Sequence, residues 1–289
     1  MKICFATIIG RPNVGKSTLL NKLLNFETAI TSPVAQTTRD QILGVYTNGN
    51  LQIVFTDTPG IHKPQNKLGE KLNKNAIESL EDIDLVMFLT PINEPIGKGD
   101  LYILDLIKNI KNKVAIITKT DLNVSIDKFQ EKERELKELG FNEIWMFNDK
   151  MQGYSNLIIE KIEKYAYEGA FFYDEDTITD KPLRFFASEI IRKYANENLR
   201  DELPHSISVQ IDEFNEGEEF WDIFSTIYVK KESQKGIIIG KAGSMIKKIG
   251  TEARKHLENQ FGVKVNLNLK VKVNKNWVDN EKQLKQWGY

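Results

Sequence analysis

The stretch from Gly10 to Ser17 has the residue types and spacing of a phosphate-binding loop. It consists of glycine, four other residues, glycine, lysine and serine. In such a loop, backbone N–H groups surround the phosphates of a nucleotide, the lysine neutralises the terminal phosphates and the serine hydroxyl binds Mg²⁺. Lys16 is therefore the first predicted catalytic residue. The predicted nucleotide contacts in and after this loop are Gly10, Asn13, Val14, Gly15, Lys16, Ser17 and Thr18.

Two further segments have groups that could complete a Mg²⁺ site. Asp57 follows an apolar run and could hold the water shell of the ion, while Gly60 could offer its N–H to a γ-phosphate. The hydroxyl of Thr38, in a polar segment between these motifs, could reach Mg²⁺ only when a γ-phosphate is present, and Thr37 is the alternative. Such a segment is a switch. The predicted metal ligands are Ser17, Thr38 and Asp57, and the predicted catalytic residues are Lys16, Thr38 and Gly60.

The segment from Thr118 to Asp121 ends another apolar run and is predicted to select the base. A carboxylate at position 121 can accept both the N1–H and the exocyclic amine of guanine, whereas adenine offers neither donor. The predicted contacts are Thr118, Lys119 and Asp121. The carboxyl ends of parallel strands are where open α/β sheets bind ligands. The sequence therefore predicts a site for a guanine nucleotide.

Apolar runs that alternate with helical patterns must position these motifs. The runs are Ile3–Ile9, Leu51–Thr56, Asp84–Leu89, Val114–Ile117 and Glu143–Phe147. Their alternation with helices predicts a mostly parallel sheet covered on both faces. Asn48-Gly49 predicts a type I′ turn between 41–47 and 51–56, so we expect one antiparallel edge and a mixed sheet.

Length and charge divide the chain into two parts. Its 289 residues suit two domains, and segment 172–182 lacks apolar periodicity and ends in proline. We therefore predict a nucleotide-binding domain at 1–171, a linker at 172–182 and a second domain at 183–289. No run approaches the ~20 apolar residues of a membrane span, and Cys4 is the only cysteine, which indicates an intracellular protein. From residue 233 onward the net charge is +8, against −9 before it, so this end is expected to bind a polyanion.

A short glycine loop in the basic region could hold a nucleic acid. Gly240 and Gly243 enclose two residues between a strand-like apolar run and an amphipathic helix. Paired glycines let phosphates approach the main chain, and a loop of this kind clamps single-stranded RNA. The predicted RNA contacts are Gly240, Lys241, Ala242, Gly243, Lys247, Lys248 and Arg254. A final strand over 263–273 is predicted to have apolar side chains on one side and lysines on the other.

Longer matches around these motifs resemble the Era family of GTPases. In the first domain they are Gly-Arg-Pro-Asn-Val-Gly-Lys-Ser-Thr at 10–18, Gln-Thr-Thr-Arg at 36–39 and Asp-Thr-Pro-Gly-Ile-His at 57–62. In the second domain they are residues 199–206, 239–250 and 284–289. The resemblance covers nearly the whole chain. It implies an α/β P-loop GTPase domain with a mixed, mostly parallel sheet, followed by an α+β type II KH domain.

The same resemblance implies hydrolysis of GTP to GDP with Mg²⁺, and binding of the 3′ end of small-subunit ribosomal RNA during late assembly of the small ribosomal subunit. We expect a cytoplasmic monomer, with weak peripheral association with the inner face of the cell membrane left open. In some GTPases with this phosphate loop, the residue matching Asn13 binds a monovalent cation, so K⁺ is a hypothetical further cofactor. Ile61 stands where Ras-like enzymes carry the glutamine that orients water, which predicts slow intrinsic hydrolysis.

Two positions depart from the family pattern around the base. Thr118 stands where the family has asparagine, and Phe147-Asn148 stands near the position of a Ser-Ala pair. Loss of one hydrogen bond would weaken nucleotide binding by roughly two- to tenfold, but Asp121 is retained, so guanine should still be preferred. The alternative is an RNA-binding assembly factor with a weakened or decayed nucleotide pocket. A second alternative is a tRNA-modification or other GTPase of the same superfamily. The KH-like block at the C-terminal end of the chain argues against this alternative.

Overall fold

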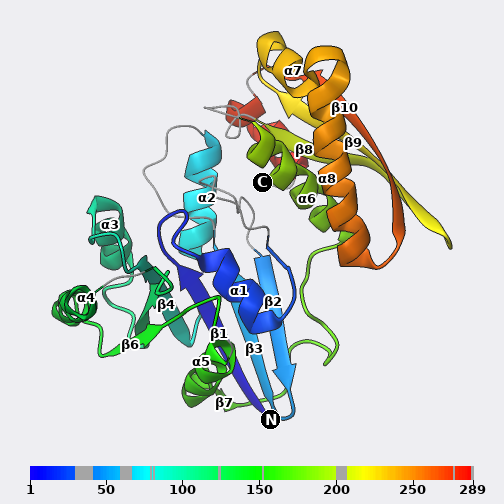
Figure 1. Cartoon of the computed structure of the whole chain (residues 1–289). Coiled ribbons are helices and arrows are strands. Elements are labelled where there is room, and N and C mark those ends of the chain that lie inside the picture. Colours follow the sequence, from blue (N-terminus) through cyan, green and yellow to red (C-terminus); the bar gives the residue numbers. More distant parts are fainter. Residues whose placement is uncertain are drawn as a thin grey trace. The chain divides into compact units, whose positions relative to one another are not determined.

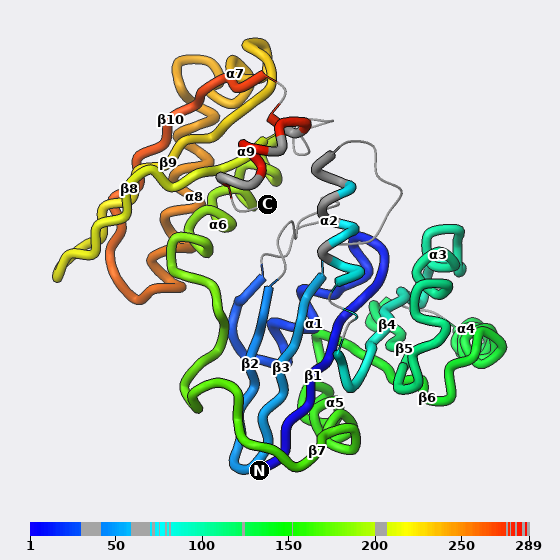
Figure 2. The backbone as a smooth tube through the Cα atoms, turned by 180° about the vertical axis from the view of Figure 1, so that it is seen from behind, coloured from blue at the N-terminus to red at the C-terminus, as the bar shows by residue number. Residues whose placement is uncertain are grey.

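A computed structural model shows two compact units, and the chain passes from the first to the second between Asp180 and Lys181 (Figure 1). The structure describes residues 1–29, 42–58, 67–78, 80, 82–122, 125–151, 153–199, 207–275 and 277–287. Figure 2 shows that each unit has a sheet of its own. Among the described residues, no helix is both long and apolar enough to cross a membrane.

The first unit is built on a seven-stranded mixed sheet. Six strands follow the order β2-β3-β1-β4-β5-β6, and β7 pairs with β1 beside that path. Their bounds are β1 Lys2–Ile9, β2 Ile42–Asn48, β3 Leu51–Asp57, β4 Leu85–Pro91, β5 Lys113–Thr118, β6 Glu143–Met146 and β7 Tyr167–Glu168. Pairing is parallel except for β2 with β3 and β7 with β1. The predicted mixed sheet with an antiparallel edge is confirmed.

Helices cover both faces of this sheet. They are α1 Lys16–Leu24, α2 Lys67–Glu78, α3 Lys98–Leu106, α4 Ile126–Glu138 and α5 Tyr154–Ile162, followed by the short η1 Glu163–Tyr165. One core joins α2, α3 and α4 to β4 and β5 through Ala76, Ile103, Leu136, Phe88 and Ile117. Helices α1 and α5 contact each other, and α1 also contacts β2 and β3. Coverage on both faces explains why the central strands are continuously apolar.

The hairpin between β2 and β3 differs from the prediction. Asn48 pairs with Leu51, so the two-residue loop consists of Gly49 and Asn50. Gly49 has a φ of +57°, whereas φ of Asn50 is not positive. A type I′ turn needs positive φ at both central residues, so the predicted turn type is wrong and glycine at the first central position fits type II′.

The second unit is built on a three-stranded sheet. Its elements are α6 Leu183–Asn198, β8 Ser208–Glu216, β9 Phe220–Val229, α7 Glu232–Ile239, η3 Lys241–Gly243, α8 Ser244–Phe261, β10 Lys264–Val273, η4 Trp277–Asp279 and α9 Glu281–Gln286. Helices α6, α7 and α8 pack on one face of the sheet, while Tyr228 on the other face contacts Trp287 after α9. Strand β9 lies in the centre, parallel to β10 and antiparallel to β8. The core includes Ile191, Ile227, Ile249 and Leu257.

The apolar run before the glycine loop is a helix, not the strand-like segment that its composition predicts. Helix α7 begins after Lys231, where the side chain of Gln234 accepts hydrogen bonds from the N–H groups of Lys230 (2.9 Å) and Lys231 (3.1 Å). Short apolar runs do not distinguish a helix from a buried strand by periodicity alone. The capping side chain at Gln234 is the local signal that favours the helix.

Residues after β7 run along the edge of the first sheet. The buried side chain of Gln52 accepts hydrogen bonds from the N–H groups of Phe172 (2.9 Å) and Tyr173 (3.1 Å) and donates one to the Tyr173 carbonyl (2.9 Å). The N–H of Val45 donates to the Ile178 carbonyl at 2.7 Å. Much of the segment predicted as a linker is therefore held by the first unit, while the exact bounds 1–171, 172–182 and 183–289 stay a prediction.

Candidate functional site

The phosphate loop connects the end of β1 to the start of α1. Gly15 caps the helix with a φ of +101°, a conformation that favours glycine, and Asn13 has a φ of +63°. A Cβ atom on Gly10 would lie 2.8 Å from the Leu89 carbonyl oxygen, so only glycine fits there. The loop therefore presents backbone N–H groups at a helix N-terminus, where anions bind. The monovalent-cation role of Asn13 stays a prediction.

Lys16 lies inside this loop and is almost fully buried. Its Nζ donates to the carbonyls of Gly10 (3.2 Å) and Arg11 (2.9 Å). Burial lowers the pKa of Lys16 to about 8, although the nearby Asp57 carboxylate acts in the opposite direction. Among the described residues both acceptors of Lys16 are neutral carbonyls. The ammonium can form stronger hydrogen bonds with charged phosphate oxygens than with these carbonyls.

Ser17 and Asp57 meet as a pair that suits Mg²⁺. The Ser17 hydroxyl donates to Asp57 Oδ2 at 2.9 Å, and Asp57 is fully buried at the end of β3. Hydroxyl and carboxylate oxygens are ligands that Mg²⁺ prefers, and they would leave room for phosphate oxygens and water. The other predicted members of this centre, Thr38 and Gly60, lie outside the described residues.

Thr118 ties the base-selecting segment to the phosphate loop. Its hydroxyl donates a 2.6 Å hydrogen bond to the carbonyl of Val14, and both groups are buried. A Cβ atom on Gly15 would be 3.8 Å from Thr118 Cβ, at van der Waals distance, so the two segments lie close together. Threonine at this position thus supplies a hydrogen bond between β5 and the phosphate loop, and the predicted weakening of nucleotide binding stays a prediction.

Asp121 presents a carboxylate beside the loop that follows β6. Lys150 Nζ lies 2.5 Å from Asp121 Oδ2, and this hydrogen bond lowers the pKa of Asp121. The Thr120 hydroxyl donates to the Phe147 carbonyl at 3.1 Å, while the Asn148 side chain accepts from the Lys150 N–H at 3.0 Å. The carboxylate is therefore ionised at neutral pH, as required for accepting two N–H groups of guanine.

A group of charged residues that the sequence did not predict holds the phosphate loop from outside. Arg11 Nε lies 2.8 Å from Asp100 Oδ2, and Arg11 Nη2 lies 3.0 Å from Glu94 Oε2. The other oxygen of Glu94 lies 3.7 Å from Lys119 Nζ. A Cβ atom on Gly99 would be 3.0 Å from Arg11 Cδ, so glycine makes room for the arginine. Glu94 follows β4 at the carboxyl edge of the sheet, a position that could have identified it.

The glycine loop of the second unit joins α7 to α8. Gly240, Ala242 and Gly243 all have positive φ, at +74°, +51° and +78°. A Cβ atom on Gly240 would lie 2.7 Å from Met245 Cβ and 2.8 Å from Met245 N, which excludes other residues there. Lys241 and Ala242 are exposed at the N-terminus of the 18-residue α8. The loop thus combines close backbone approach, positive charge and a helix N-terminus.

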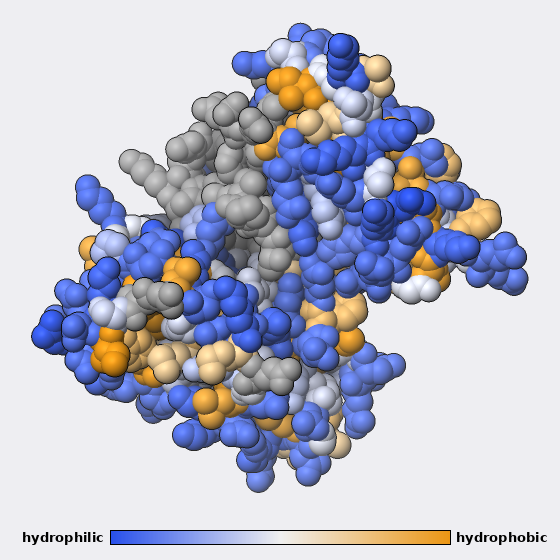
Figure 3. Space-filling view, in the orientation of Figure 1, coloured by the Kyte–Doolittle hydropathy of each residue, from blue (hydrophilic) through white to orange (hydrophobic). Residues whose placement is uncertain are grey.

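The outer face of α8 is basic. Lys247, Lys248 and Arg254 are exposed, whereas Ile249 and Leu257 are buried in the core. Lys248 is 4.0 Å from Glu252 and Arg254 is 3.8 Å from Glu258, so both ion pairs are loose. The surface over α8 is strongly hydrophilic in Figure 3. Lys247 and Lys248 lie in the first turns of α8, next to the glycine loop, whereas Arg254 lies about three turns from the loop. The contacts of all three with RNA stay a prediction.

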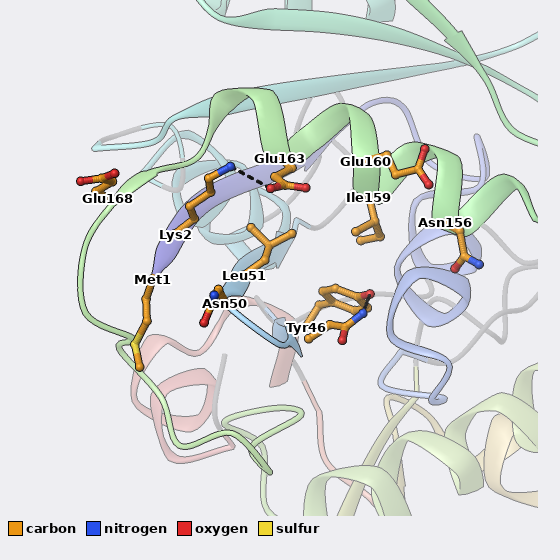
Figure 4. A pocket seen from close by; sticks show the side chains of 11 residues that line it. Met1, Lys2, Tyr46, Asn50, Leu51, Asn156, Ile159, Glu160, Glu163 and Glu168 are labelled. Atoms are coloured by element: carbon orange, nitrogen blue, oxygen red, sulfur yellow. Dashed lines mark hydrogen bonds and ion pairs between the residues drawn. The ribbon is translucent and has the colours of Figure 1, made fainter.

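A cavity of about 650 Å³ lies at the other end of the first sheet. Figure 4 shows that Lys2 and Tyr46 line it, together with Glu163, whose carboxylate is 2.8 Å from Lys2 Nζ. Lys2 begins β1, whereas the phosphate loop follows the end of that strand. This cavity is therefore separate from the nucleotide site, since open α/β sheets bind ligands at the carboxyl ends of their strands.

Replacing Thr118 by valine should weaken GDP binding about fivefold, because it removes a hydrogen bond worth about 1 kcal/mol and leaves the Val14 carbonyl without that donor. Thr118→Ser keeps the hydroxyl and should bind GDP within about twofold of the wild type. Isothermal titration of each variant measures the difference. Equal affinities of the valine and serine variants would contradict the role of this hydrogen bond.

Nucleotide binding should take up a proton near pH 8. The pKa of Lys16 is lowered to about 8 by burial, and phosphates beside the ammonium would raise it again. GDP affinity should therefore be level below pH 8 and fall by up to about tenfold per pH unit above it. Titration calorimetry at pH 8.5 in two buffers of different ionisation enthalpy reports the uptake directly. Equal apparent enthalpies at pH 8.5 would contradict this linkage, and the difference between the buffers should be smaller at pH 7.

Comparison with known proteins gives consistent matches for both units. Residues 5–120 match the family model of the 50S ribosome-binding GTPase, and residues 202–278 match that of the KH domain. The chain is 55% identical to the GTPase Era of Mycoplasmopsis agalactiae, with 100% of both chains covered. It is 54% identical to the GTPase Era of Mycoplasmopsis pulmonis, with 99% of each covered.

Two solved structures are similar over the full length. One is Era in complex with MgGDPNP and nucleotides 1506–1542 of 16S ribosomal RNA, with a TM-score of 0.95, 36% identity, and 100% of this chain and 99% of that chain covered. The other is an Aquifex aeolicus Era variant bound to GDP·AlF₄⁻, with a TM-score of 0.94, 36% identity and the same coverage. These matches agree with the fold of each unit.

Proposed function

Because the chain belongs to the Era family of GTPases, we propose that it binds and hydrolyses GTP as a switch, binds the 3′ end region of small-subunit ribosomal RNA and assists late assembly of the small ribosomal subunit. The observation that carries the nucleotide half is the Thr118–Val14 hydrogen bond, which joins the base-selecting and phosphate-binding segments into one site. A similar protein binds MgGDPNP and the 3′ part of 16S ribosomal RNA together.

The residues of the nucleotide site have separate tasks in this proposal. When the nucleotide binds, Lys16 leaves its carbonyl partners and contacts phosphate oxygens. Asp121 leaves Lys150 and accepts hydrogen bonds from the N–H groups of guanine. Ser17 and Asp57 would hold Mg²⁺, which would neutralise charge that develops on the phosphates. Thr38 and Gly60 are proposed to order around the γ-phosphate, and this order is lost after hydrolysis.

The second unit is proposed to bind the RNA through the glycine loop and the basic face of α8. Gly240 and Gly243 let phosphates reach the backbone, and Lys241 adds charge at the N-terminus of α8. We further infer that the protein acts as a cytoplasmic monomer. Peripheral association with the inner face of the cell membrane stays a prediction.

The experiment that tests the nucleotide half is a competition titration. A fluorescent GTP analogue bound in Mg²⁺ and K⁺ buffer should be displaced by GTP and GDP but not by the same concentration of ATP. Asp121→Asn is the matched variant, since it keeps the size of the side chain but loses one of two acceptors, and it should lose the preference for guanine. Displacement by ATP as readily as by GTP would favour the alternative of a decayed pocket.

A further inference from the structure

One strand of the second unit carries an exposed row of N–H donors that the proposed RNA site does not use. The row is defined as Lys264, Asn266, Asn268, Lys270 and Lys272, which occupy every second position of β10. All five are exposed, whereas the residues between them, such as Val265, pack into the core under the helices. The β10 row therefore lies on the face of the sheet opposite α6 and α8, and none of its residues belongs to the glycine loop.

Aromatic side chains stand beside this row on the neighbouring strand. In the parallel register, Phe220 pairs with Lys264 and Phe224 pairs with Asn268, which puts both rings on the same face as the row. Phe220 is 45% exposed, and Phe224 is half-buried. Exposed rings flanked by lysines are typical of surfaces that stack the bases of single strands.

Carboxylates are distributed unevenly over the same face. Asp222 pairs with Asn266 in the register and accepts a 3.1 Å hydrogen bond from its amide. Asp212 and Glu213 are exposed on β8, at the opposite edge of the sheet from β10. A polyanion is therefore attracted to the β10 edge and repelled from the β8 edge, which limits its path to the line of the row.

We propose that the β10 row binds single-stranded RNA that continues from the segment held by the glycine loop. The proposal rests on the proposed function of the second unit. Lysines of the row contact phosphates, the two asparagines contact base edges, and Phe220 and Phe224 stack bases. At about 3.3 Å per residue, the eight steps from Lys264 to Lys272 span about 26 Å, which is enough for several nucleotides.

The simpler explanation is that lysines protect an edge strand from pairing with other chains. Strand β10 does lie at an edge of its sheet, so this explanation predicts aggregation of a lysine-free variant with unchanged RNA affinity. The RNA proposal predicts the reverse, a monodisperse variant with weakened binding. The exposed aromatic ring of Phe220 favours the RNA proposal, because edge protection does not require it.

The test uses the full-length protein and two RNAs from the 3′ end of small-subunit ribosomal RNA. One is a short fragment just long enough for the glycine loop, and the other is the same fragment extended by about ten nucleotides at each end. For Lys264→Ala/Lys270→Ala/Lys272→Ala, affinity for the long RNA should fall at least tenfold. The slope of log affinity against log salt should become shallower by about 2, as expected for three lost phosphate contacts.

The short RNA separates this proposal from the proposed function. The triple variant should bind it within about twofold of the wild type, and Phe220→Ala should weaken only the long RNA, by about fivefold. Arginine at the same three positions keeps the positive charges, so this variant should bind the long RNA as the wild type does. The matched control, Lys74→Ala/Lys108→Ala/Lys137→Ala, removes three exposed lysines of the first unit and should behave as the wild type.

Three results would overturn the proposal or its premise. Unchanged affinity of the triple variant for the long RNA would leave the row as edge protection only. Equal losses for both RNAs would show that the substitutions disturb the fold or the glycine loop. Absence of short-RNA binding by the wild type would overturn the proposed function of the second unit itself.

Discussion

Replacing Lys16 by alanine should lower the single-turnover rate of GTP hydrolysis by about 10²- to 10³-fold. Lys16 is the positive charge buried inside the phosphate loop, and its Nζ has only the carbonyls of Gly10 and Arg11 as hydrogen-bond acceptors there. Charge that develops on the phosphates would meet this ammonium in a site from which water is largely excluded. Quenched-flow measurement with saturating GTP gives the rate of the chemical step.

The same substitution should leave the melting temperature at pH 7 unchanged or slightly raised. The pKa of Lys16 is lowered to about 8 in the folded protein, below its ordinary value, because burial disfavours the ammonium. Only the unfolded chain holds this proton between about pH 8 and the ordinary pKa of lysine, whereas both states hold it below pH 8. The cost of burying the ammonium is therefore fully present at neutral pH, and its removal relieves this cost.

Lys22→Ala is the matched control for Lys16→Ala, since Lys22 lies exposed in the last turn of the same helix. It should hydrolyse GTP at the wild-type rate. If Lys16→Ala retained a rate within about threefold of the wild type, the catalytic role of Lys16 would be wrong. If its melting temperature fell sharply while Lys22→Ala stayed stable, the residue would be structural.

The two binding loops could be predicted from the sequence because their chemistry is local. Gly10, Lys16 and Ser17 have fixed spacing, and the backbone at Gly15 and Gly243 has the positive φ that glycine favours. In each case neighbouring residues set the conformation, so a short pattern contains the necessary information. The strands of the mixed sheet could also be predicted, because each of them is a local apolar run.

Contacts between distant segments could not be predicted in this way. Arg11 meets Asp100 only because β1 and β4 are neighbours in the sheet, and nothing in the sequence near either residue specifies its partner. Gln52 holds residues 172 and 173 by the same kind of long-range contact. The misread α7 has another cause, because a run of three isoleucines suits a strand by propensity and is decided here by packing and capping.

Replacing Lys241 and Ala242 together by aspartate should weaken RNA binding at least about tenfold without unfolding the second unit. Both side chains are exposed in the glycine loop, so the change replaces one positive charge by two negative charges where phosphates are proposed to lie. The fold should tolerate it, because position 242 has a φ of +51°, which aspartate accepts better than most residues. Fluorescence anisotropy with a short single-stranded RNA measures the affinity.

A matched control separates this local effect from the general change in net charge. Lys108→Asp/Asn109→Asp makes the same change of −3 at exposed positions of the first unit and should alter RNA affinity by no more than about twofold. GTP hydrolysis without RNA should be unchanged in both variants. Equal weakening by both pairs would mean that long-range repulsion, rather than the glycine loop, controls binding. A clear difference between them would locate the RNA backbone at the N-terminus of α8, where the two glycines permit its approach.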